Sequence, residues 1–524
     1  MNGAESLVHT LLKSGVDTCF CNPGTSEMHF VAALDRIPGM HCVLGLFEGV
    51  VTGAADGYGR MADKPASTLL HLGPGLANGL ANLHNANRAS TPVVNIVGDH
   101  ATYHRRYDAP LTSDIEGAAR PFSHWVKTSP DAGAVATDGA AAIAAARTPP
   151  GRIATLVLPA DTAWNEVAPS DSTPSDTTGI AGVPRAPARV QTSREAVANA
   201  VTVLRSGAPT VLLLSGLALR EHGLNLAGRI AKATGAKLLC QTSNARIQRG
   251  AGRVAIDRVP YPVDQALAVL KDVRHVILIG AKAPVAFFAY PNKPSVMTPE
   301  GCAIHTLATP SEDAVHALEW LADELGATGQ PAPVEPSKKP ELPTGAITLD
   351  ALAAAIGALL PDQAVVVDES ITSGRNLFPY TRGAAPHDWL QNMGGSIGIG
   401  LPLATGAAVA CPDRRVVCLE SDGSGMYTLQ ALWTQAREKL DVTTVLFSNR
   451  VYGILKIELA NVGAQNPGRK ALDMLEIGRP DLDWVGLAQS MGVEASRATT
   501  IDEFIDQFRV GLRKRGPHLI EVVL

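Results

Sequence analysis

The segment Leu419–Gly425, LESDGSG, determines how the last third of this 524-residue chain is interpreted. It ends an apolar, β-branched run, places an aspartate among small residues, and leads into a helical pattern over Met426–Lys439. Small residues at a helix start let backbone N–H groups approach an anion. An aspartate would repel a bare phosphate, but it fits if Mg²⁺ lies between carboxylate and phosphate. Taken alone, Asp422-Gly423 could also be a turn that caps a helix.

A second segment, Ser448–Gly453 (SNRVYG), follows the next apolar run along the chain. Asn449 comes 27 residues after Asp422. One strand–helix–strand unit takes about 30 residues and returns the chain to the same edge of a parallel sheet. We therefore expect the two side chains to lie side by side at adjacent strand ends. Their oxygens, a backbone carbonyl, two diphosphate oxygens and a water would complete a six-oxygen Mg²⁺ shell.

Together the two segments resemble the thiamine diphosphate (ThDP)-dependent enzyme family, whose signature is Gly-Asp-Gly, a spacer of this length, and Asn-Asn. Here serine, Ser421 or Ser448, takes the first position of each element. The resemblance implies that Asp422, Asn449 and the carbonyl of Val451 bind Mg²⁺. The other cofactor contacts that it implies in this region are Gly423, Ser424 and Tyr452.

The first third of the chain contains a candidate activating acid. Glu48 is the only acid in the apolar, glycine-rich run Leu44–Ala55. A buried carboxylate is costly unless it is partnered, and its pKa tends to rise. ThDP needs such a glutamate to hydrogen-bond its aminopyrimidine ring, and EGVVTGAADGY, residues 48–58, resembles the family's motif. An exposed acid at a helix N-terminus is the alternative.

The family resemblance also implies an oligomer, because the two domains around one cofactor come from different subunits. Glu48 of one chain should face Asp422 of its neighbour. A homodimer is then the smallest complete unit, and we expect a homotetramer.

Two more polar residues follow apolar runs in the first third. The loop Asn22–Glu27 resembles that of benzoylformate decarboxylase and acetolactate synthase, with Thr25 where the decarboxylase has a catalytic serine. The ordinary role of such a threonine is to cap a helix. His71 matches an active-site histidine of the decarboxylase, and histidine can shuttle protons near neutral pH. A structural histidine is the alternative there.

Two loops of the last third complete the implied cofactor site. The segment Gly394–Pro402 resembles the one that supports the bent cofactor, with Ser396 as a contact and Ile397 as the wedge between its rings. A stiff β-branched residue suits a wedge, although a buried loop hydrophobe is the alternative. Ser370 and Thr372 resemble another loop that contacts the diphosphate.

Pro-rich stretches at residues 169–189 and 327–345 lack apolar periodicity and divide the chain into domains at 1–168, 190–326 and 346–524. In each block, short apolar runs alternate with helical patterns, which is typical of a parallel sheet covered on both faces. We predict an α/β fold of three doubly wound parallel-sheet domains, which the resemblance identifies as pyrimidine-binding, middle and diphosphate-binding domains. The predicted strands are residues 16–21, 67–71, 93–97, 153–158, 211–214, 237–240, 276–279, 364–367, 416–419, 442–447 and 519–524.

Composition excludes several classes of partner. The formal charge is -5 and no long run carries a single sign, so we expect no nucleic acid and no membrane partner. Seven cysteines without a C-x-x-C pair, no signal-like N-terminus and no run of about 18 apolar residues favour a cytoplasmic protein. FAD is not expected, because Leu213–Gly216 lacks a G-x-G-x-x-G fingerprint.

The resemblance implies decarboxylation of a 2-oxo acid through a carbanion/enamine, followed by protonation or carboligation of the acyl unit. One alternative is acetolactate synthesis from pyruvate, but Glu458 stands where those synthases have tryptophan. Another is a catalytically weak relative that serves as a partner or regulatory subunit, which Ser421 and Ser448 suggest. Lys282–Tyr290 (KAPVAFFAY) lacks the histidine of benzoylformate decarboxylase. Its two phenylalanines favour either an apolar substrate tail or a packed core.

Overall fold

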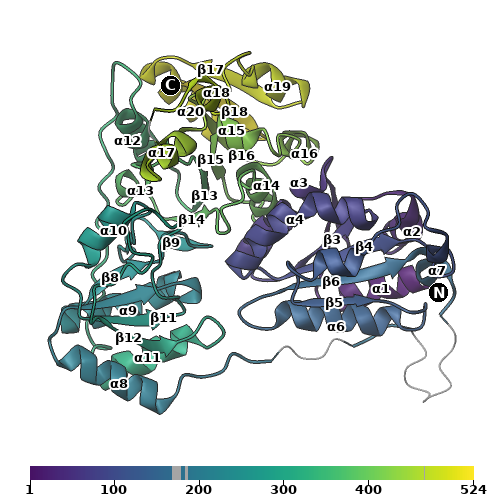
Figure 1. The fold of residues 1–524 in the computed structure, drawn as a ribbon, viewed down its shortest axis with the longest axis horizontal. Helices are drawn as coiled ribbons and strands as arrows, with labels where there is room; N and C mark the ends of the chain where they lie inside the picture. The colour runs from purple at the N-terminus through teal and green to yellow at the C-terminus, as the bar shows by residue number, and fades with distance from the viewer. Residues whose placement is uncertain (168–178, 183–186, 465) are drawn as a thin grey trace.

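The computed structural model of the protein describes residues 1–167, 179–182, 187–464 and 466–524. Most of the first predicted connector, residues 169–189, lies outside these ranges. The second connector, residues 327–345, is largely exposed and belongs to no helix and to none of the sheets. Three sheets follow one another along the chain, each with helices around it (Figure 1). The predicted three-part α/β fold is therefore confirmed.

The first sheet is fully parallel, in the order β2-β1-β3-β4-β6-β5. Its apolar core lies on both faces, with α1, α2 and α6 covering one and α3, α4 and α5 covering the other. The strands are β1 (Thr18–Asn22), β2 (His41–Leu44), β3 (Ala66–Leu70), β4 (Val93–Asp99), β5 (Trp125–Thr128) and β6 (Ile153–Pro159). The helices are α1 (Gly3–Lys13), α2 (Met28–Arg36), α3 (Glu48–Ala62), α4 (Leu72–Ala89), α5 (Ile115–Ala119) and α6 (Val135–Arg147).

The second sheet is also parallel, in the order β10-β8-β7-β11-β12. Its strands are β7 (Thr210–Leu214), β8 (Lys237–Cys240), β10 (Asp257–Arg258), β11 (His275–Ile279) and β12 (Ala303–Ala308). Its helices are α8 (Arg194–Arg205), α9 (Glu221–Thr234), α10 (Val263–Leu270) and α11 (Ala314–Glu324).

The third sheet has the order β17-β18-β16-β15-β13-β14-β9 and is parallel except for its last pair. Its strands from the last third are β13 (Ala364–Glu369), β14 (His387–Gln391), β15 (Val416–Ser421), β16 (Val442–Ser448), β17 (Glu494–Ala498) and β18 (His518–Val523). The helices used below are α12 (Leu349–Leu359), α14 (Gly400–Ala410), α16 (Ala431–Arg437), α17 (Gly453–Asn461) and α20 (Ile501–Arg513).

Two features differ from the expectations. First, β9 (Ile247–Arg249) comes from the middle block but pairs antiparallel with β14, so the third sheet takes a strand from outside the predicted domain. Second, the helical pattern over Met426–Lys439 is not one helix. The chain forms α15 (Asp422–Gly425), a turn, and only then α16. Hydrogen bonds from Tyr427 N–H to Ser424 and from Ala431 N–H to Thr428 tighten that turn and break the helix.

The first and third domains meet where α3 packs against α14 (Figure 1). Glycines allow this contact: a Cβ on Gly57 would overlap the carbonyl of Leu403, and one on Gly406 would overlap the carbonyl of Ala54. The two helix backbones therefore approach more closely than larger residues would permit. Among the described residues, no helix is both long and apolar enough to cross a membrane.

Candidate active site

Asp422 and Asn449 lie together at the carboxyl edge of the third sheet. β15 and β16 run in register to their ends, where Ser421 pairs with Phe447. Asp422 Oδ2 accepts a 2.6 Å hydrogen bond from the N–H of Arg450, the residue after Asn449. Asn449 Oδ1 accepts a 3.1 Å hydrogen bond from the N–H of Val451. The juxtaposition expected from the 27-residue spacing is therefore present.

The serine in place of the first glycine of the signature fits its position. Ser421 has φ −96 and ψ 146, an extended conformation that any residue adopts. Its Oγ donates a 2.8 Å hydrogen bond to Ser424 Oγ. Because Ser424 accepts in that bond, its own hydroxyl proton stays free to donate to a phosphate. Serine at position 421 thus leaves the Ser424 hydroxyl proton available.

Three more expected contacts come from the loops after β16 and β13. Tyr452 packs on the turn, its ring 2.6 Å from where a Cβ on Gly423 would stand. Thr372 Oγ1 lies 2.9 Å from the corresponding point on Gly453. Ser370 also follows β13, but its hydroxyl donates a 2.5 Å hydrogen bond to Asp368. Thr372 and Tyr452 therefore border the predicted metal site, whereas the Ser370 hydroxyl must rotate before it can donate elsewhere.

The segment that carries Ser396 and Ile397 is fixed between two domains. Asn392 of the third domain donates a 2.8 Å hydrogen bond to the Ser396 carbonyl, and Asn85 of α4 donates another of 2.8 Å. Asn392 also donates to Glu369, whose other oxygen accepts a 2.6 Å bond from Gly400 N–H. Ile397 is partly buried, and its role as a wedge stays a prediction.

Local electrostatics favour a cation at this edge. Asp422 is 2% exposed, and this burial raises the pKa of its carboxyl. Hydrogen bonds from the N–H groups of Arg450 and Gly423 oppose that rise. A cation beside the carboxylate would lower that pKa again. The carboxylate, the amide oxygen of Asn449 and backbone carbonyls are the hard oxygen ligands that Mg²⁺ prefers. The residues present therefore fit a magnesium ion and a diphosphate.

Glu48 is the first residue of α3 and is buried, with 8% of its surface exposed. Its Oε2 accepts a 2.9 Å hydrogen bond from Asn78 Nδ2 on α4. The alternative of an exposed acid at a helix N-terminus is wrong about the exposure. Glu48 does begin a helix, as that alternative supposed. Asn78 was not among the expected site residues, because an asparagine within a helical run carries no distinguishing sequence signal.

His71 is paired with a glutamate that the sequence analysis did not single out. Its Nδ1 lies 2.8 Å from Glu27 Oε2, which also accepts a 2.7 Å hydrogen bond from Gly24 N–H. Glu27 is 2% exposed, and burial raises its pKa while His71 opposes the rise. A carboxylate on Nδ1 orients the ring and leaves Nε2 for proton transfer. The only sequence signal was an acid two residues after Thr25 in the same loop.

Thr25 begins a short 3₁₀ helix, Thr25–Glu27, whose cap position is held by Gly24. The alternative that Thr25 caps the helix is therefore wrong. Its side chain is exposed at the end of β1, on the same loop as Glu27. A hydroxyl in that position is available to a ligand.

Glu48 and His71 border one another at the carboxyl edge of the first sheet. A Cβ on Gly75 would stand 3.0 Å from Glu48 Oε1 and 3.3 Å from the Cβ of His71. Within the described part of one chain, no hydrogen bond or ion pair joins Glu48 to Asp422. The structure thus brings the predicted residues into two groups, one on the first domain and one on the third.

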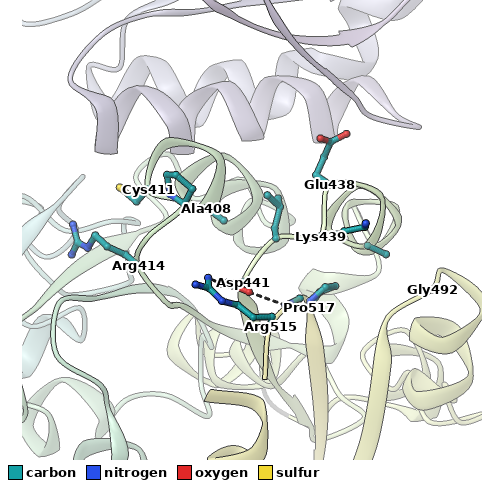
Figure 2. Close-up of a pocket in the computed structure, with 13 residues that line it drawn as sticks. Ala408, Cys411, Arg414, Glu438, Lys439, Asp441, Gly492, Arg515 and Pro517 are labelled. Atoms are coloured by element: carbon teal, nitrogen blue, oxygen red, sulfur yellow. Dashed lines mark hydrogen bonds and ion pairs between the residues drawn. The ribbon is translucent and has the colours of Figure 1, made fainter. Parts of the chain in front are cut away.

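A cavity of about 370 Å³ lies elsewhere (Figure 2). It is found at the amino edge of the third sheet, where β15, β16 and β18 begin, and therefore opposite Asp422. Its lining includes Cys411, Arg414, Lys439, Asp441 and Arg515. It contains none of the predicted site residues.

Comparison with known proteins gives two matches to one family. Residues 1–125 match the thiamine pyrophosphate enzyme N-terminal TPP-binding domain. Residues 373–522 match the C-terminal TPP-binding domain of the same enzymes.

Individual relatives span nearly the whole chain. IlvX of Mycobacterium tuberculosis, provisionally named as an acetolactate synthase large subunit, is 54% identical, covering 100% of this chain and 99% of that protein. Benzoylformate decarboxylase of Pseudomonas aeruginosa is 27% identical, covering 98% and 97%. The solved 4-hydroxybenzoylformate decarboxylase of Rhodococcus jostii RHA1 has a TM-score of 0.86 at 23% identity, covering 99% and 98%. This last likeness shows a shared fold.

Proposed function

This chain belongs to the family of thiamine pyrophosphate enzymes, and from that premise we propose that it decarboxylates a 2-oxo acid with ThDP and Mg²⁺ bound. The acyl unit that remains is then protonated or joined to a second carbonyl compound. The observation that carries the proposal is the convergence of Asp422, Asn449 and Val451 at two adjoining strand ends.

In the third domain, Asp422, Asn449 and the Val451 carbonyl would hold Mg²⁺, while the Gly423 backbone and the Ser424 hydroxyl would hold the diphosphate. The free proton of Ser424 supports its part in this set. When bound, ThDP supplies the electron sink that carbon–carbon cleavage requires. The protein supplies position and electrostatics.

The first-domain residues would handle protons. Glu48, buried and hydrogen-bonded to Asn78, would hydrogen-bond the aminopyrimidine ring and exchange a proton with it. His71, oriented through Nδ1 by Glu27, would give or take a proton at Nε2. The Thr25 hydroxyl, exposed at the same edge, would donate a hydrogen bond to the substrate carboxylate.

We propose that the complete site forms between subunits, in a homodimer at least and a homotetramer in the full assembly. The family resemblance supports this, because in these enzymes the two domains around one cofactor come from different subunits. Within one chain, the first and third domains are held together by close packing of α3 against α14.

Acetolactate synthesis from pyruvate is the second candidate, supported by the 54% identity to a protein provisionally named for that activity. A cofactor-poor regulatory subunit is not favoured, because Ser421 is accommodated without loss of the Ser424 donor.

Cofactor titration tests the proposal at its first step. The protein should bind ThDP tightly only with Mg²⁺, and Asp422→Ala should weaken binding at least about tenfold. Asp413→Ala, an exposed acid far from the predicted ligands, is the matched control. Magnesium-independent binding, or equal affinity in both variants, would refute the assignment.

A panel of 2-oxo acids scored for CO₂ release and products then identifies the reaction, and accumulation of acetolactate from pyruvate alone would favour the second candidate.

A further inference from the structure

Two phenylalanines of the middle domain, Phe287 and Phe288, are exposed rather than packed in a core. Phe287 is 50% exposed and Phe288 is 52% exposed. Both lie between β11 and β12, in a segment without regular structure. Of the two explanations that the sequence left open, a packed core is therefore wrong.

Phe287 lies directly on the third domain. The three atoms nearest to where a Cβ on Gly395 would stand are all ring atoms of Phe287, the closest being Cζ at 2.6 Å. Gly395 has φ +78, in the left-handed region that glycine favours. It immediately precedes Ser396 and Ile397, the residues expected to contact the cofactor. The ring therefore contacts the start of the segment that is expected to hold the cofactor.

A hydrogen bond between domains holds the ring in place. Phe287 packs against Tyr261, with ring centroids 5.6 Å apart. The Tyr261 hydroxyl donates a 3.2 Å hydrogen bond to Glu458 Oε1. Glu458 lies on α17, the helix that starts directly after Tyr452. Burial raises the pKa of Tyr261, so its hydroxyl stays a donor. Tyr261 and Glu458 thus tie the middle domain to the helix that follows the metal site.

We propose that the exposed half of the Phe287 ring recognises the side chain of the substrate and selects 2-oxo acids with an aromatic tail over pyruvate, with Tyr261 and Glu458 as positioning residues. This inference rests on the proposed function. An aromatic tail can stack on or meet the edge of the Phe287 ring, as paired aromatic side chains do. The methyl group of pyruvate offers little area for that contact. A single methylene in an apolar pocket discriminates between substrates by about 10- to 200-fold, so we expect an aromatic ring to do at least as much.

The test uses the full-length holoenzyme with ThDP and Mg²⁺, and phenylglyoxylate and pyruvate as probes. The wild type should favour phenylglyoxylate by at least about tenfold in kcat/KM for CO₂ release. Phe287→Ala should reduce that ratio about tenfold, mostly through a higher KM for phenylglyoxylate. Val285→Ala, 64% exposed in the same segment, is the control and should leave the ratio unchanged.

The positioning residues are tested by a conservative pair. Tyr261→Phe keeps the ring but loses the bond to Glu458, so the ratio should fall by about two- to fivefold. Glu458→Gln keeps an acceptor for Tyr261 and should retain most of the preference. A purely structural role would lower the melting temperature of both variants without moving the ratio, and that result would overturn their assignment.

A measurement without turnover separates this inference from the proposed function. Mandelate and lactate, the 2-hydroxy counterparts of the two probes, cannot lose CO₂ in the same way and serve as binding probes by calorimetry. Tighter binding of mandelate that is lost in Phe287→Ala supports the inference even if neither 2-oxo acid releases CO₂, which would refute only the proposed reaction. Equal binding of both probes, or a ratio unchanged by Phe287→Ala, overturns the inference.

Discussion

The glycine at position 98 makes room for the carboxylate that holds His71. A Cβ added at Gly98, on β4, would overlap Oε1 of Glu27, and that oxygen has no hydrogen-bond partner among the described residues. The buried acid therefore fits only because the neighbouring strand has no side chain there. At the scale of single residues, catalytic geometry at this edge depends on positions that carry no chemistry themselves.

Gly98→Ala should lower kcat/KM for CO₂ release by about 10- to 100-fold, because Glu27 must move and His71 loses its orientation. The unfolding free energy should fall by no more than about 1–3 kcal/mol, the usual cost of overpacking. Gly329→Ala, where a Cβ meets nothing within 4 Å, is the matched control for both measurements. Wild-type turnover in Gly98→Ala would show that the Glu27–His71 pair does not contribute to the reaction.

At the scale of elements, β13 and β15 end with two buried glutamates side by side. Glu369 and Glu420 are register partners, and each is at most 1% exposed. Burial raises the pKa of Glu369 to about 7 and also raises the pKa of Glu420, where the charge of Glu369 adds to the effect. Two adjacent carboxyls in such a site cannot easily both be ionised.

This pair predicts a pH-dependent stability. Folding raises the pKa of Glu369 from 4.5 to about 7. The stability that the protonated carboxyl adds to the folded state is therefore complete below pH 4.5 and is lost as the pH rises through about 7. The unfolding free energy should therefore decline between pH 5 and pH 8, by at most about 1.4 kcal/mol per unit for one proton. Glu369→Gln should flatten that decline, measured by urea denaturation at several pH values. Parallel curves for Glu369→Gln and the exposed control Glu503→Gln would contradict it.

The strand β9 joins the middle block to the third sheet through Arg249. The guanidinium carbon of this buried residue lies 3.6 Å from the centroid of the Phe378 ring. Its nitrogens donate to Thr381 Oγ1 at 2.7 Å and to the Phe378 carbonyl at 2.6 Å. One side chain thus supplies both the cation–π contact and the hydrogen bonds that fix β9 against the segment Phe378–Thr381.

Arg249→Met keeps the apolar stem but removes the buried cation and both of its hydrogen bonds, which should cost about 2–4 kcal/mol of unfolding free energy. Arg36→Met, at an exposed ion pair with Glu5, should cost less than about 1 kcal/mol. Thermal and urea denaturation of the two variants compare the effects directly. Similar losses in both would mean that the β9 contact is not stabilising.

At the scale of the whole molecule, the position of the two residue groups predicts complementation between subunits. Glu48→Gln and Asp422→Ala should each be nearly inactive alone. Randomly mixed dimers of the two should regain about a quarter of wild-type activity, because half are heterodimers with one unsubstituted site each. Glu48→Gln mixed with His71→Ala should regain none, since both residues lie on the first domain. Mixed dimers that form, as seen by native mass spectrometry, but stay inactive would place the site within one chain.

The sequence predicted the interior of each sheet well and its margins poorly. Every predicted strand exists, and most lie within two residues of the predicted limits. The strands it missed are the six edge strands β2, β5, β9, β10, β12 and β17, together with β14. Most edge strands face solvent on one side and do not read as continuous apolar runs. β14 (HDWLQ) is buried throughout, but it contains polar residues and therefore shows no apolar run. One of them, Asp388, is paired with Arg246 and Arg414.

By itself, the sequence determined the fold class and the side-chain identities at the ends of β15 and β16, because strand periodicity and the length of a crossover are local properties of the chain. Only the tertiary structure decided which partner each of those side chains has: Glu27 for His71, Asn78 for Glu48, and the Phe287 ring on Gly395. These pairs are separated by 44, 30 and more than 100 positions along the chain. Contacts over such separations depend on how packed elements meet, which no local pattern of residues encodes.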